Sequence, residues 1–194
     1  MLTPAEEAAL TAKAGILPLG VAGSATPAFA QTFDRRFCTS TVLTPTSGTM
    51  YMTAINLSAG QVVKGITFVS VGGETGGTNL WFALYRSDLV LMGQATNDTG
   101  ATSFASGTAF RMALATAQTC PYTGMYYLAF MCTHSAGTTP TLHNVVATAA
   151  TVNGSIAGMP PILSATSSTG LTSTAPNPAG ALTAIVNSLY AFVD

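Results

Sequence analysis

Apolar and polar positions follow a period of two along much of the chain between residues 49 and 132. Six segments in this stretch are rich in aromatic and β-branched residues and are bounded by Gly, Ser, Asn, Asp or Pro, a pattern typical of β-strands. They are residues 49–55, 62–71, 79–86, 89–95, 107–114 and 124–132. Strands at this spacing, joined by loops, predict an all-β fold, a jelly-roll-like antiparallel β-sandwich.

The segment NLWFALYR (79–86) is apolar on both of its faces, which predicts a central strand covered from two sides. Residues 86–88 predict a tight turn that pairs this strand with 89–95 in a hairpin. The run VGGETGG (71–77) predicts a flexible loop between two strands. It does not fit a phosphate-binding loop, because no Lys-Ser or Lys-Thr pair and no helix follows it.

The segments on either side of the predicted sandwich differ from it in composition. In residues 1–48 we expect a helix over 3–14, with Thr3 as its N-cap and Gly15 as its end, and then an extended docking arm. Residues 133–194 are rich in Pro, Thr and Ser, and we expect an extended C-terminal tail that wraps over a neighbouring molecule. Its last strand, LYAFV, would complete the sheet or pair with a neighbour. The expected organisation is therefore 1–48, 49–132 and 133–194.

Charge is scarce, with six Lys or Arg against seven Asp or Glu and a net charge of −1. Without a basic surface, nucleic-acid binding is not expected. No long run is free of polar residues, so membrane insertion is not expected either. Residues 14–30 end in a small-x-small site but follow two Glu and one Lys, the wrong balance for a secretory signal, so we expect synthesis in the cytoplasm without one. A neutral, polar surface favours coverage by partner molecules.

Few residues could carry chemistry. Cys132, His134 and His143 could supply three zinc ligands, but no fourth lies near them in the sequence, so neither a metal nor a cofactor is expected. Cys120 and Cys132 could form a disulfide or act as small buried residues. No Gly-x-Ser-x-Gly motif is present, and the acids left over for a glycosidase pair are Asp34, Glu74 and Asp98. We therefore do not expect an enzyme.

Two groups of residues could bind a partner. The first is a docking cluster in which three aromatic rings recur every four residues around a dense charge cluster, namely Phe29, Phe33, Asp34, Arg35, Arg36 and Phe37. Its arginines could recognise a carboxylate on a partner, or they could simply be solvated. The second is Trp81 and Tyr85, which share one strand face and could stack on a sugar. The alternative for this pair is packing inside the sandwich.

The run LSAGQVVKGITFVSVGGETGGTNLWFALYRSDLVLMGQATND, with TGMYYLAFMC and GMPPILSATSSTGLTSTAP further on, resembles virion proteins of tailed phages that infect actinobacteria. The resemblance covers residues 49–194 and concerns minor tail, fibre and capsid-surface proteins. It implies a jelly-roll-like, oligomeric module without catalytic residues. We therefore expect a homotrimeric capsid decoration protein on the virion exterior, with major capsid or other virion proteins as partners. The alternative is a receptor- or glycan-binding module of a tail fibre or tail tip, with a host-surface glycan as its partner.

Overall fold

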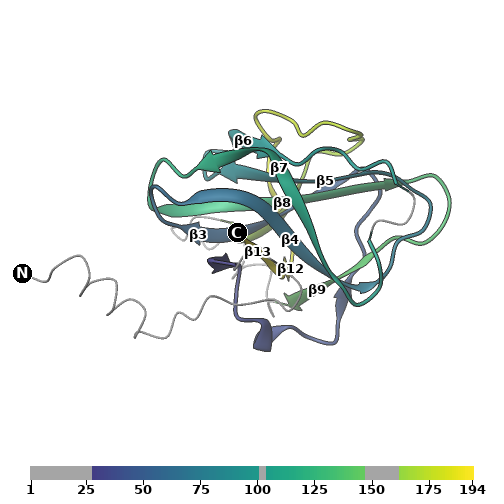
Figure 1. Cartoon of the computed structure of the whole chain (residues 1–194). Helices are drawn as coiled ribbons and strands as arrows, with labels where there is room; N and C mark the ends of the chain where they lie inside the picture. The colour runs from purple at the N-terminus through teal and green to yellow at the C-terminus, as the bar shows by residue number, and fades with distance from the viewer. Residues whose placement is uncertain (1–27, 101–103, 147–161) are drawn as a thin grey trace, which may run out of the picture.

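A computed structural model of the chain describes residues 28–100, 104–146 and 162–194 (Figure 1). In these residues two antiparallel β-sheets pack face to face, which confirms the predicted all-β sandwich. The expected helix over 3–14 lies outside the described residues. In the part of the chain that is described, there is no helix long and apolar enough to cross a membrane.

The first sheet has the strand order β1-β13-β4-β9-β12, with β7 paired to β4 and β2 paired to β9. Its strands are β1 (Ala30–Gln31), β2 (Val42–Leu43), β4 (Val62–Gly72), β7 (Ala109–Thr119), β9 (Thr141–Val146), β12 (Asn187–Leu189) and β13 (Ala191–Val193). The second sheet has the order β11-β10-β3-β8-β5-β6. Its strands are β3 (Met50–Leu57), β5 (Gly77–Arg86), β6 (Leu91–Gln94), β8 (Gly124–His134), β10 (Ser164–Ser167) and β11 (Thr183–Ala184).

The six strands predicted from alternation correspond to β3, β4, β5, β6, β7 and β8, which confirms each of them. The turn after β5 also forms as predicted, because β5 and β6 pair as an antiparallel hairpin. The expected loop of 71–77 is shorter in the structure, because β4 extends to Gly72 and β5 begins at Gly77. The remaining strands are two to six residues long, and apart from β13, which the sequence predicts within LYAFV, no apolar alternation marks them.

The space between the two sheets holds the main core, built from inward-facing residues of β3, β4, β5, β7 and β8. Aromatic rings form its centre. The ring of Phe82 lies edge-on to that of Phe68, with centroids 4.8 Å apart, and Phe130 contacts both. Such tilted and edge-to-face contacts add to the free energy gained from burying the rings.

The second sheet is also apolar on its outer face, where Met50, Met52, Trp81, Tyr85 and Met131 are buried. The chain covers this face with the loop that connects β10 to β11, residues 168–182, which we call the cover loop. The Trp81 indole Nε1–H donates to the Thr172 carbonyl and the Tyr85 hydroxyl to the Pro176 carbonyl, each at 2.8 Å. Strand β5 is therefore central and covered on both faces, as its sequence predicts.

The segments expected as arms fold onto their own sandwich. Strand β1 pairs with β13 and β2 pairs with β9, so residues 28–48 lie against the first sheet. The expectation that the tail wraps over a neighbour is wrong for its described residues, because β10 pairs with β3 and the cover loop packs on β5 and β8 of the same chain. The last strand, β13, completes the sheet by pairing with β4.

The last residue is fixed by an ion pair. Asp194 is buried, and the Arg111 guanidinium on β7 donates to both of its carboxylate oxygens at 2.7 Å. Gly65 makes room for this pair, since a Cβ there would lie 2.5 Å from the Arg111 guanidinium. Figure 1 accordingly shows the C-terminus beside β4 and β13.

The hydrogen bonds from Trp81 and Tyr85 should hold the cover loop closed. A Tyr85→Phe substitution leaves the Pro176 carbonyl without its donor and should cost about 1–2 kcal/mol of stability. We expect faster proteolytic cleavage within the cover loop, measured by mass spectrometry of a timed digest. Tyr122→Phe is the matched control, because the Tyr122 hydroxyl bonds to Ser87 and not to the cover loop. Equal cleavage of the cover loop in both variants would contradict the assignment.

Candidate docking site

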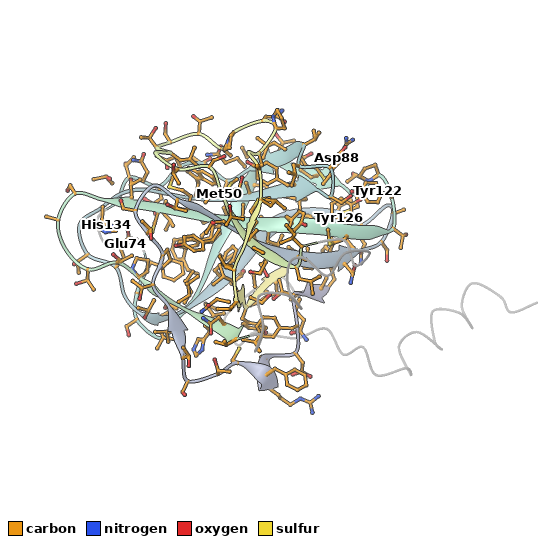
Figure 2. All side chains as sticks on the ribbon, turned by 180° about the vertical axis from the view of Figure 1, so that it is seen from behind. Met50, Glu74, Asp88, Tyr122, Tyr126 and His134 are labelled. Atoms are coloured by element: carbon orange, nitrogen blue, oxygen red, sulfur yellow. The ribbon has the colours of Figure 1, made fainter. Side chains whose placement is uncertain are left out.

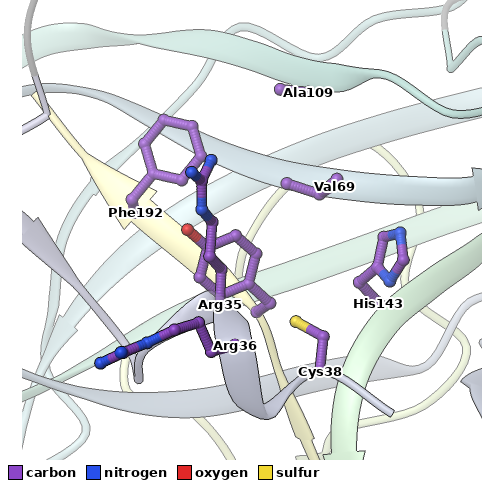
Figure 3. A pocket seen from close by; sticks show the side chains of 8 residues that line it. Arg35, Arg36, Cys38, Val69, Ala109, His143 and Phe192 are labelled. Carbon is purple, nitrogen blue, oxygen red and sulfur yellow. The ribbon is translucent and has the colours of Figure 1, made fainter. Parts of the chain in front are cut away.

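A short 3₁₀ turn, η1 (Arg35–Phe37), stands on the first sheet and borders a pocket of about 450 Å³ (Figure 3). The pocket has an apolar floor, formed by Val69 of β4, Tyr190 between β12 and β13, and Phe192 of β13. Its polar lining comes from Arg35, Arg36, Cys38 and His143. These residues lie far apart in the sequence and meet because β13 and β9 both pair with β4.

Asp34 shapes the turn. It is the N-cap of η1, and its carboxylate accepts the Arg36 backbone N–H at 2.9 Å and the Arg36 guanidinium at 2.6 Å. These hydrogen bonds hold the pKa of Asp34 below its ordinary value and raise the pKa of Arg36. Because the pair is exposed to solvent, its main effect is on geometry: it holds the Arg36 guanidinium against Asp34.

The docking cluster expected from the sequence divides into inner and outer members. Phe33 packs on the Tyr190 ring at a centroid distance of 5.5 Å, and Phe29 packs against the main core. These two rings anchor the segment on its own sandwich, and both are half-buried. Phe37 points outward and is 64% exposed. The surface left for a partner is Arg35, Arg36 and Phe37.

Arg35 differs from its neighbour Arg36. Its side chain is exposed and extends over the pocket toward the Phe192 ring, whereas Arg36 points away (Figure 3). Among the described residues, no carboxylate lies within ion-pair distance of Arg35. The pocket thus combines an apolar floor with an unpaired cation, an arrangement that suits an apolar group carrying a carboxylate.

The sugar-stacking interpretation of Trp81 and Tyr85 is wrong for this structure. Both side chains are 0% exposed, and the cover loop lies over their rings. They do share one face of β5, as expected, but that face is buried. Neither ring can stack on a sugar without removal of the cover loop.

The residues considered for zinc do not come together. Cys132 lies in the main core and His143 at the docking pocket, while the His134 ring bonds to Thr139 at 2.9 Å. Within the described residues, no group of three or more His, Cys, Asp and Glu side chains could hold a metal ion. All three cysteines are free, and Cys120 and Cys132 are buried, in line with their interpretation as small core residues.

Of the three acids left open for catalysis, Glu74 is the unusual one. It follows β4 at the same end of the sandwich as His134 (Figure 2), is only 4% exposed, and neither of its carboxylate oxygens has a hydrogen-bond partner among the described residues. Burial raises its pKa from 4.5 to about 7, and the nearby Asp98 carboxylate adds to the effect. Asp34 instead forms an ion pair with Arg36, so the three acids do not form one site.

The sequence contains a signal that Glu74 is buried, but it contains none that predicts the docking pocket. A Glu in a Gly-rich loop between two apolar strands is at risk of burial, and Gly77 leaves the space it needs, because a Cβ there would lie 2.4 Å from the Glu74 Oε1. Tyr190, Phe192 and His143, in contrast, become pocket residues only through strand pairing.

No family model and no curated protein matches this chain.

Glu74 should make stability depend on pH. Its pKa is higher in the folded chain than in the unfolded chain, so the folded state retains a proton that the unfolded state releases. Stability should therefore fall as the pH rises from 4.5 to about 7, by about 3 kcal/mol in all. Glu74→Gln should remove this slope, so that the variant is more stable than the parent at pH 8 and similar at pH 4.5. Urea denaturation at several pH values measures the free energy of unfolding of both proteins. If this free energy depends on pH in the same way in the two proteins, the prediction is contradicted.

Proposed function

We propose that this chain is a non-enzymatic structural protein of a phage virion, an oligomeric decoration protein on the capsid exterior. The observation that carries the proposal is the surface of Arg35, Arg36 and Phe37, which places an exposed ring and two cations beside an apolar pocket on an otherwise nearly uncharged chain. Such a combination is typical of a protein-binding surface, in which aromatic and Arg side chains carry most of the binding energy.

A second feature of the same segment supports this proposal. Another hollow, of about 520 Å³, is lined in part by Gln31, Thr32 and Phe33, just before the turn. Leu163, which is 45% exposed, also lines it. The segment 31–38 therefore borders two pockets, so a partner that contacts it can bury apolar surface in both.

The β-sandwich and the low charge also agree with a role in assembly. Neutral surfaces rich in hydroxyl and methyl groups impose little electrostatic repulsion when copies meet, which permits the proposed homotrimer to assemble. The location on a particle is proposed from the resemblance of residues 49–194 to virion proteins of actinobacterial phages. The alternative, a glycan-binding module, loses the residues that suggested it, because Trp81 and Tyr85 are buried.

The proposal predicts that the chain stays on purified particles through Arg35, Arg36 and Phe37. Particles assembled with the triple variant Arg35→Ala, Arg36→Ala, Phe37→Ala should retain at least tenfold less of it, measured by quantitative mass spectrometry after density-gradient purification. The matched control is Val62→Ala with Lys64→Ala, which removes an exposed apolar side chain and an exposed cation from β4. Immunogold labelling of the parent particles then separates a capsid location from a tail location.

Two results would contradict the proposal. The first is absence of the chain from purified particles, which would show that it is no virion protein. Alternatively, the triple variant and the control could be retained equally, in which case the chain docks through another surface.

A further inference from the structure

Charge pairing among the described residues leaves the Arg35 guanidinium without a carboxylate. Over this part of the chain, the cations outside any ion pair are Arg35 and Lys64. Lys64 is exposed on β4 and does not line the docking pocket, whereas Arg35 extends over it (Figure 3). The docking pocket therefore has one positive charge at its rim that the described chain does not neutralise.

The rest of the docking pocket is largely apolar. Val69, Ala109, Tyr190 and Phe192 line it, and its volume of about 450 Å³ is that of a small-molecule site. The rings of Tyr190 and Phe192 are tilted by 52°, with centroids 6.1 Å apart, so they do not form a parallel-sided slot for a flat ring. A flexible alkyl chain can follow the angle between these two rings.

The docking pocket offers few polar groups to a ligand. The Tyr190 hydroxyl donates to the Gln31 Oε1 at 3.2 Å, and the Arg36 guanidinium donates to the Asp34 carboxylate. A peptide placed in the pocket would bury backbone amide groups with few partners, and such burial is costly. An alkyl chain has no polar group to satisfy. The lining thus favours a ligand whose one polar group is the anion that meets Arg35.

We infer that the docking pocket binds a small amphiphilic monocarboxylate, a medium-chain fatty acid, with its carboxylate at Arg35 and its alkyl chain on Val69, Tyr190 and Phe192. The planar fork of a guanidinium matches the two oxygens of a carboxylate, and one cation balances one negative charge. The inference concerns the isolated chain and does not depend on a place in a virion. If the proposed function also holds, a partner that contacts Phe37 and the two arginines binds over an occupied pocket.

Decanoate is the probe for this site, and the sample is the full-length chain at pH 7. Isothermal titration calorimetry below the micelle concentration of decanoate should show saturable binding of a single molecule per chain. Decanol keeps the alkyl chain without the charge, and butyrate keeps the charge with a short chain, so each should bind at least about tenfold more weakly. Decanoate should also raise the midpoint of thermal unfolding, because a ligand that binds only the folded chain stabilises it.

Removal of the Arg35 charge tests the contact with the carboxylate. Arg35→Gln should weaken decanoate binding roughly tenfold and leave decanol binding unchanged, because only decanoate loses a charge-assisted hydrogen bond. Lys64→Gln is the matched control, since it removes the other described cation outside an ion pair and does not line the pocket. Both side chains are exposed, so thermal unfolding should show that each variant retains the fold.

Cys38 reports where the ligand lies, because it is a free cysteine that lines the docking pocket. Cys120 and Cys132 are buried and should react slowly. Decanoate should slow the alkylation of Cys38 by N-ethylmaleimide, measured by mass spectrometry of timed digests. At the same decanoate concentration, this protection should persist in Lys64→Gln and be lost in Arg35→Gln.

The opposite results would overturn the inference. They are an absence of decanoate binding, equal affinities for decanoate and decanol, equal decanoate binding by Arg35→Gln and Lys64→Gln, or binding that leaves Cys38 unprotected. Tighter binding of the peptide acetyl-Ala-Ala-Leu, which ends in a free carboxylate, would assign the pocket to a protein C-terminus and would also contradict the inference. None of these results affects the particle-retention experiment, so the two ideas can fail separately.

Discussion

The second sheet is apolar on both faces, and the rest of the structure depends on covering both. The first sheet buries one face against the main core. The other carries Trp81, Tyr85 and three methionines, a surface too large and apolar to leave in water. The chain covers this face with its own cover loop. Strands β10 and β11, at the edge of the same sheet, fix both ends of that loop. The Pro- and Ser-rich tail is therefore part of the fold.

The same constraint explains how far the sequence could predict the structure. Alternation marks the six strands from β3 to β8 because one set of their side chains faces the core between the sheets, while the other set faces the cover loop or solvent. It gives no information on β9 to β12, which are short segments held as strands by their pairing, as of β10 with β3 and of β12 with β9. The docking cluster was visible as a charge and aromatic pattern, but which rings point inward depends on Tyr190, at the far end of the chain.

Scarcity of charge gives each ion pair a separate role. Asp34 and Asp88 each pair with an arginine two residues away, so these charges are neutralised locally and shape turns. Arg111 on β7 and Asp194 after β13 join these two strands across β4, over Gly65. A chain with so few charges and a net charge of −1 has little long-range field, so recognition must rely on contact and shape at particular places. Among the described residues Arg35 is in no ion pair, and it stands over an apolar pocket.

The two unusual charges respond to different conditions. Glu74 is buried at one end of the sandwich, and its raised pKa makes neutral and alkaline pH unfavourable for the surrounding loop. The Asp34–Arg36 pair beside the docking pocket has a lowered carboxyl pKa, so it persists until the pH falls below the ordinary range of an aspartate. Mild acidification thus stabilises the Glu74 end and leaves the docking turn intact. Binding through Arg35 can therefore be measured between pH 5 and 7 without a change in the geometry of the turn that presents it.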